Sequence, residues 1–322
     1  MTEVSKPLPL FRLPTLLLRN ISRYMDLQEI LLISLASKKS AFIIKSLLPL
    51  NSFNLKLLFC TETKIVLDAK GPWDRDPVTI KRQKDGYIFK LQITQPSGDV
   101  SYQWAGPQLQ ELVKILLAHF ATVFNPTISI KFGDWKFRNL GQGFAMSVLK
   151  HVKQLNFMTT SLKIFADISP ENYKFILDEY REVPELWLYC EVTKDFEYHL
   201  GPDFRVDDLL ISDGHWMHCE DFSNCKKVAV WNSSGHKQLK YANLEVPRAL
   251  IRKWIESDCR LEHFTVSSFP IKFNFRLVLQ GLGFRTIEQT EDFHGVEITR
   301  KCDGKKATVT CSEYDFELKV ID

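Results

Sequence analysis

Residues 13–39 read LPTLLLRNISRYMDLQEILLISLASKK, and this stretch decides the architecture of the N-terminal part of the chain. Pro14 suits the first turn of a helix, where its missing N–H is not needed. Apolar residues then recur at a spacing of four from Leu13 to Met25, which places them on one side of a helix. The pattern predicts a helix that ends near Met25.

Capping residues predict a second helix directly after the first. Asp26 can cap it, and Glu29, three residues later, completes a capping box. This helix is apolar nearly all round, so one side could face the rest of the chain and another an outside partner. Its apolar positions include Leu27, Ile30, Leu31, Leu32, Ile33 and Leu35.

Ser37 is suited to cap a third helix. Pro49 should end it, because proline disfavours helix in the residue that precedes it. We expect this helix to carry Phe42, Ile43 and Leu47 inward. Three helices in about forty residues bury too little apolar surface to be stable alone, so they need something to pack on.

Over residues 9–48 this run resembles the F-box pattern: a Leu-Pro start, spaced apolar positions, and the ending Ser37-Lys38-Lys39. Leu16 stands where an acidic residue is common, and Ser40 where a tryptophan is often found. Both departures are familiar in the large nematode-expanded branch of F-box proteins, which the chain resembles. The resemblance implies a Skp-type adaptor as partner and, through it, a cullin. It places the adaptor contacts at Leu13, Pro14, Leu17, Ile21, Ile30, Leu31 and Leu35.

After Pro49 the pattern changes to strands, including a hairpin turned at Asp85-Gly86, and a helix is predicted at 107–123. From about residue 127, β-branched or aromatic runs alternate with helical stretches. This order predicts a mostly parallel sheet, either a leucine-rich-repeat-like solenoid or a layered α/β domain. Uneven spacing and the missing repeat consensus favour a degenerate repeat. The strands are expected at 128–132, 162–165, 185–190, 208–211, 227–231 and 261–266, and the helices at 144–152, 171–181 and 246–256.

The C-terminal segment predicts an antiparallel cap on this body. Strands at 296–300 and 307–311 flank Asp303-Gly304, a strong hairpin signal, and residues 314–320 alternate as a further strand. Such a cap would close the open end of a sheet. The expected fold class is therefore α+β or α/β: a small three-helix F-box, an irregular leucine-rich-repeat-like strand-helix body, and a C-terminal antiparallel cap.

Residues 207–268 carry a second resemblance, to the F-box-associated domain of type 2, which accompanies the nematode F-box. The similarity lies in the order of a strand at 208–210, a helix containing Lys253-Trp254, and a strand that opens with Leu261-Glu262. Without the resemblance, Lys253-Trp254 and Leu261-Glu262 would be interpreted only as core positions of a helix and a strand.

Candidate chemistry is sparse. His215, His218, Cys219 and Cys225 lie within eleven residues, but without a Cys-x2-Cys pair their spacing is not that of a zinc module. The sequence contains neither a Gly-x-Ser-x-Gly nucleophile elbow nor a phosphate-binding glycine loop. We therefore predict no catalytic residue, no metal and no cofactor. Aromatic anchors of a recognition surface could come from Trp73, Trp104, Trp135, Trp187, Trp216, Trp231 and Trp254, which the sequence does not sort into exposed and core positions.

Charge and composition narrow the class of protein. Residues 1–50 hold seven basic and three acidic residues, whereas the remainder holds 35 and 36, so the positive excess is confined to the N-terminal segment. The body has no excess of basic residues, so its charge does not indicate a nucleic-acid partner. No stretch approaches the roughly 20 apolar residues that span a bilayer. Seven scattered cysteines predict reduced thiols, and hence a location in the cytoplasm and/or nucleus.

These observations predict a non-enzymatic binding subunit. As the resemblance implies, we expect residues 1–8 to form a tail, 9–50 an F-box, and 51–322 a body that selects a protein for ubiquitination by a Skp-cullin-F-box ligase. The substrate is not predicted. The alternative is a repeat-type interaction scaffold without a ligase role, in which residues 9–48 only cap the body.

Overall fold

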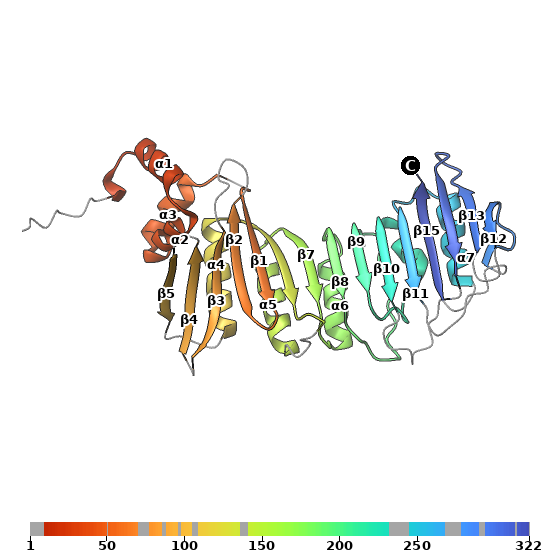
Figure 1. Ribbon diagram of the computed structural model, residues 1–322, viewed down its shortest axis with the longest axis horizontal. Helices are drawn as coiled ribbons and strands as arrows, with labels where there is room; N and C mark the ends of the chain where they lie inside the picture. Colours follow the sequence, from red (N-terminus) through yellow and green to blue (C-terminus); the bar gives the residue numbers. More distant parts are fainter. Residues whose placement is uncertain are drawn as a thin grey trace, which may run out of the picture. The chain divides into compact units, whose positions relative to one another are not determined.

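The computed structural model describes residues 10–49, 51–69, 77–85, 88–95, 98–104, 109–135, 141–231, 245–267, 278–289, 294–312 and 314–321. The chain divides into two compact units, one of residues 1–131 with 143–159 and one of 132–142 with 160–322. The N-terminal helices are followed by a mixed sheet and helices, an α+β architecture (Figure 1).

The N-terminal module consists of one 3-10 turn and three helices: η1 (Leu10–Arg12), α1 (Thr15–Tyr24), α2 (Leu27–Ala36) and α3 (Lys38–Leu47). The Glu29 carboxylate accepts the N–H of Asp26 at 2.9 Å, which satisfies a free donor at the start of α2. The Ser37 hydroxyl accepts the N–H of Ser40 at 3.0 Å at the start of α3. The three helices that the sequence predicts are confirmed.

The apolar interior of the module comes from all three helices. Its buried residues are Leu18, Leu27, Ile30, Leu31, Ile44 and Leu47. The prediction that α3 carries Phe42 inward is wrong, because this side chain is 73% exposed. The buried positions of α3 are Ser40, Ile44 and Leu47, spaced by four and three. A residue two positions from Ser40 and from Ile44 lies on the opposite side of a helix with 3.6 residues per turn.

Unit 1 also contains a sheet in the order β6-β1-β2-β3-β4-β5, in which β1 to β5 form an antiparallel meander. The predicted hairpin corresponds to β3 and β4, although its Gly86 lies outside the described residues. Strand β5 was not predicted. The elements are β1 (Phe53–Phe59), β2 (Thr63–Ala69), β3 (Val78–Asp85), β4 (Ile88–Gln95), β5 (Gly98–Trp104), α4 (Leu109–Val123), β6 (Thr127–Phe132) and α5 (Gln142–Gln154).

Helix α4 supplies the packing surface that the three short helices need. Helix α3 contacts α4, and the buried Ser34 hydroxyl of α2 lies 2.8 Å from Nε2 of His119 in α4. His119 also contacts the rings of Phe120 and Phe124. Burial of this imidazole lowers the pKa of His119, since water no longer stabilises its charged form.

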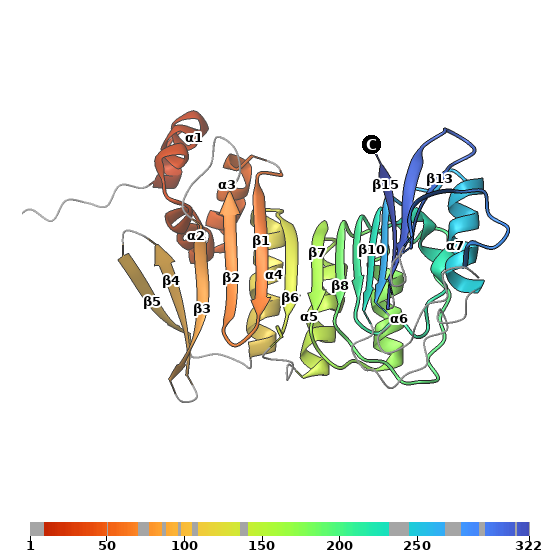
Figure 2. The same ribbon diagram turned by 45° about the vertical axis from the view of Figure 1, so that its right-hand side comes forward.

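Unit 2 begins with five strands that pair in parallel in chain order: β7 (Thr159–Ile164), β8 (Glu185–Leu188), β9 (Asp208–Ile211), β10 (Lys227–Trp231) and β11 (His263–Ser267). The connections contain α6 (Pro170–Glu179), η3 (Cys219–Asn224) and α7 (Glu245–Glu256). Figure 2 shows α6 and α7 on one face of these strands. Leu162, Leu186 and Leu209 are fully buried, as expected for the covered face of the sheet.

An antiparallel set completes unit 2, as the sequence predicts. Strand β15 (Asp315–Ile321) pairs with β11, β14 (Lys306–Cys311) with β15, β13 (His294–Thr299) with β14, and β12 (Arg285–Gln289) with β13. Gly304 adopts a φ of 74° in the predicted turn between β13 and β14. Strand β12 was not predicted.

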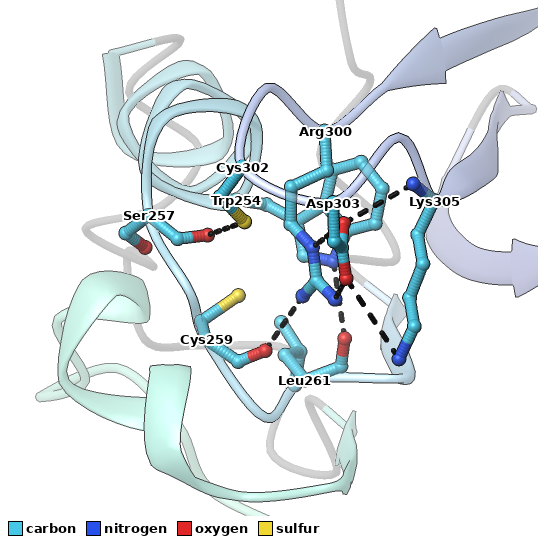
Figure 3. Close-up of polar contacts among 8 residues, drawn as sticks. All are labelled: Trp254, Ser257, Cys259, Leu261, Arg300, Cys302, Asp303 and Lys305. Atoms are coloured by element: carbon cyan, nitrogen blue, oxygen red, sulfur yellow. Dashed lines mark hydrogen bonds and ion pairs between the residues drawn. The ribbon is translucent and has the colours of Figure 1, made fainter.

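Arg300 ties this turn to α7 and to the segment before β11 (Figure 3). Its guanidinium donates to both Asp303 carboxylate oxygens, at 2.8 and 2.5 Å, and to the carbonyl of Cys259 at 2.7 Å. It also lies 5.3 Å from the Trp254 ring, whose Nε1 donates to the carbonyl of Leu261 at 3.1 Å. Trp254 and Leu261, singled out in the sequence, are thus buried core positions that contact each other.

Candidate functional site

The N-terminal module exposes a set of large apolar side chains that its own packing does not use. Leu16 is 71% exposed and Leu17 47%, on α1, and Phe42 is exposed on α3. Phe11 in η1 and Leu35 near the end of α2 are exposed to a lesser degree. Scattered exposed apolar residues are normal on a protein surface, but a concentration of them in one small module indicates a contact site.

The structure separates the seven predicted contact residues into three groups. Pro14, Leu17 and Leu35 are exposed. Leu13 and Ile21 are half-buried. Ile30 and Leu31 are fully buried within the module, so their side chains support the fold of the module and offer no area to a partner.

Four exposed large hydrophobic residues of the module lie outside the predicted set: Phe11, Leu16, Tyr24 and Phe42. Leu16 could have been found from the sequence, because it is the position at which the chain departs from the F-box pattern by replacing an acidic residue. No signal in the sequence identifies Phe42, because its exposure depends on which face of α3 packs against the neighbouring helices. The spacing of four that starts at Leu13 does not include either residue.

Exposed basic side chains accompany these apolar residues. They are Arg12, Arg19, Arg23, Lys38, Lys39 and Lys45, whereas the exposed acidic residues in the helices and caps of the module are Asp26 and Glu29. Both acidic residues belong to the capping box of α2. The surface therefore combines apolar anchors with a positive field, which favours a partner whose docking face is apolar and acidic.

The residues considered as zinc ligands in the sequence, among them His215, Cys219 and Cys225, are buried or form hydrogen bonds within the protein. His215 is buried, with Nδ1 2.7 Å from Oδ1 of Asp213 and Nε2 3.0 Å from the carbonyl of Thr193. Burial raises the pKa of the Cys225 thiol to about 12 and the pKa of the Cys219 thiol further, which disfavours the thiolates that ligate zinc. Among the residues that the structure describes, no group of three or more His, Cys, Asp or Glu side chains could hold a metal ion.

The described tryptophans fall into two classes. Trp216 and Trp254 are fully buried, and Trp187 is half-buried. Trp135 is 59% exposed and Trp231 41%, both in unit 2. Trp73 lies outside the described residues, as does the side chain of Trp104.

Within the described part of the chain, no helix is both long and apolar enough to cross a membrane.

Comparison with known families finds an F-box domain at residues 10–51. This range covers η1 and the three helices described above. No curated protein and no solved structure matches the chain.

Proposed function

We propose that this chain, which carries an F-box domain at residues 10–51, binds a Skp-type adaptor and selects a protein target for a cullin-based ubiquitin ligase. The F-box suggests a component of such a ligase, and proteins with this module are generally adaptors rather than enzymes. The observation that carries the proposal is the set of apolar side chains exposed on the same helices, led by Leu16, Leu17 and Phe42.

The module uses different apolar residues for its own core and for its exposed surface, which supports this function. Ile30, Leu31 and Ile44 are buried and hold the helices together, so they keep the module folded without a partner. Leu17 and Leu35 belong to the predicted adaptor contacts and are exposed, which leaves their area available for association. Apolar side chains at the centre of an interface carry most of its binding energy.

The test is a binding measurement against a purified Skp-type adaptor with the full chain. Leu17→Asp and Phe42→Asp should each weaken binding by at least roughly 30-fold, the loss typical of a central interface residue. Ile115→Asp is the matched control, since Ile115 is 48% exposed on α4, outside the F-box. Circular dichroism and thermal unfolding should show the same folded state for all three variants.

The basic residues of the module add a second readout. If they attract an acidic partner, the association rate should fall as salt is raised, because salt screens exposed charges. Replacing Lys38 and Lys39 with glutamine should reduce that salt dependence. Wild-type binding by both Leu17→Asp and Phe42→Asp would contradict the proposal and leave the repeat-type scaffold without a ligase role as the better account.

The finer assignments of the body belong to this proposal as well. Parallel strands β9, β10 and β11 occupy the region that resembles the F-box-associated domain of type 2. The hydrogen bond from the Trp254 indole to the Leu261 carbonyl supports treating that region as one folded piece. Strands paired in chain order support a repeat-like body. We assign target binding to this body and place the protein in the cytoplasm and/or nucleus, where the ligase acts.

A further inference from the structure

The in-register parallel strands of unit 2 place side chains in rows across the sheet, and one row is aromatic. On the face away from Leu162, Leu186 and Leu209, the register aligns Lys163, Trp187, Leu210 and Ala229 across β7, β8, β9 and β10. These four strands lie side by side in Figure 1. Two residues further on, the next row contains Phe165, Tyr189 and Trp231. Residues two apart along a strand share a face, so both rows belong to one surface.

The aromatic rings of this surface form one contiguous cluster. The rings of Phe165 and Tyr189 stack at 4.2 Å with an interplanar angle of 12°. Trp135 packs edge-on against both, at 5.5 Å from Phe165 and 4.3 Å from Tyr189. Trp231 lies 5.9 Å from Tyr189 and stacks with Trp135 at 6.2 Å and 23°. We call Phe165, Tyr189, Trp135 and Trp231 the aromatic platform.

Exposure is distributed unequally within the aromatic platform. Phe165 and Tyr189 are buried and make its base, together with Leu210. Trp135 and Trp231 are the exposed outer members. Two indoles held in place by buried rings lose little conformational freedom when they bind, which is why tryptophan is frequent among the anchors of interfaces.

On the same sheet face, one indole ring already binds a cation. Lys163 holds its ammonium 3.5 Å above the Trp187 ring, and Glu185 fixes it with an ion pair of 2.7 Å. The ring face carries a negative quadrupole that attracts cations. Among the residues that the structure describes, no lysine or arginine lies over either exposed indole of the aromatic platform, so both ring faces are open to a cation.

Carboxylates follow the rings of the aromatic platform along the chain. Asp167 stands two residues after Phe165, and Glu191 two residues after Tyr189. Both are exposed, and neither forms an ion pair with a residue that the structure describes. Negative charge two residues along the chain from two rings of the aromatic platform disfavours the phosphates of a nucleic acid and favours lysine or arginine.

We propose that the aromatic platform binds a basic peptide segment, in which an arginine or lysine stacks on Trp135 or Trp231 and is drawn in by Asp167 and Glu191. This deepens the proposed function, on which it rests for its biological role: the target class would be proteins with an exposed basic segment. The geometry of the platform itself is independent of the F-box. Binding to the platform and binding to the adaptor are therefore separable measurements.

The experiment selects displayed random 12-residue peptides on the immobilised full chain, then measures a synthetic peptide from the selected pool by fluorescence anisotropy. The pool should be enriched in arginine and lysine over the starting library. Trp135→Ala or Trp231→Ala should weaken the peptide on the order of 30-fold. Ile287→Ala is the matched control, because Ile287 is 56% exposed on β12, and it should change binding less than about twofold.

A charge variant tests the second half of the proposal without touching the rings. Asp167→Asn with Glu191→Gln should weaken the peptide several-fold, roughly as expected for two exposed charges, and should flatten its salt dependence. A pool that is acidic, neutral or not enriched at all would overturn the proposal, as would tighter binding of single-stranded RNA than of peptide. If Trp135→Ala still binds the adaptor, a negative result with the peptide leaves the proposed ligase function unaffected.

Discussion

Replacing Arg300 with methionine should lower the free energy of unfolding of unit 2. Arg300 is 4% exposed and forms three charge-assisted hydrogen bonds, two to the Asp303 carboxylate and one to the Cys259 carbonyl. Its guanidinium also packs on Trp254 (Figure 3). These contacts join the β13–β14 turn to α7 and to the segment before β11, so their loss should loosen the C-terminal cap.

The expected cost is smaller than the sum of the three bonds. A charge-assisted hydrogen bond contributes roughly 1.5–3 kcal/mol net. Methionine, however, removes the buried charge together with its desolvation penalty and keeps apolar contact with Trp254. Asp303 is also about a third exposed, so water can replace its lost partner. We expect a net loss of about 2 kcal/mol, which corresponds to a fall in Tm of roughly 4–8 °C for a unit of this size.

Asp303→Ala provides the sharper comparison. It leaves the Arg300 guanidinium buried with only the Cys259 carbonyl among the acceptors of Figure 3, and an uncompensated buried charge is more costly than a hydrated carboxylate. Asp303→Ala should therefore destabilise more than Arg300→Met. Lys305→Ala is the control, since Lys305 is exposed and its ammonium lies 4.0 Å from Asp303.

Urea unfolding followed by tryptophan fluorescence, together with calorimetry, would measure the three variants. The reasoning fails if Arg300→Met unfolds like the wild type or if Asp303→Ala is the milder change. A loss with Lys305→Ala equal to that with Arg300→Met would show that the turn responds to any change of charge and that the buried contacts carry no special weight.

Three further outcomes follow from the charges and burial described above. The hydrogen bonds from Arg300 lower the pKa of Asp303. The contribution of Asp303 to stability is therefore full above the unfolded pKa of about 3.9 and is lost as pH falls through the lower folded value. The free energy of unfolding of Asp303→Asn should accordingly converge with that of the wild type in acid. Burial lowers the pKa of His119, so unit 1 should lose stability as pH falls below about 6.5, and His119→Gln should weaken that dependence; an unchanged slope would contradict the burial argument. A maleimide reagent at pH 8 should modify the exposed Cys302 in the native protein while Cys219 and Cys225 react only after unfolding, as mass spectrometry of the modified peptides would check.

Local signals in the sequence determined the elements of this protein. Pro14 marks the start of the first helix through its fixed φ. The Asp26–Glu29 pair and Ser37 mark the starts of the next two, because they satisfy backbone donors that are next to them in the chain. Asp303-Gly304 marks a turn for a similar reason, since glycine accepts a positive φ without steric cost. The parallel strands were recognisable from β-branched runs separated by helices.

The tertiary structure decided which apolar residues are available to a partner. In the sequence Ile30, Leu35 and Phe42 are equally apolar, yet Ile30 is buried while Leu35 and Phe42 are exposed, because the position of each depends on which neighbouring helix packs against it. Strands β5 and β12 were not predicted, although each pairs with the neighbouring strand in the chain. The aromatic platform arises in the same way: Trp135, Phe165, Tyr189 and Trp231 are up to 96 positions apart in the sequence. The register of parallel strands aligns the last three, and the folded chain brings Trp135 against them.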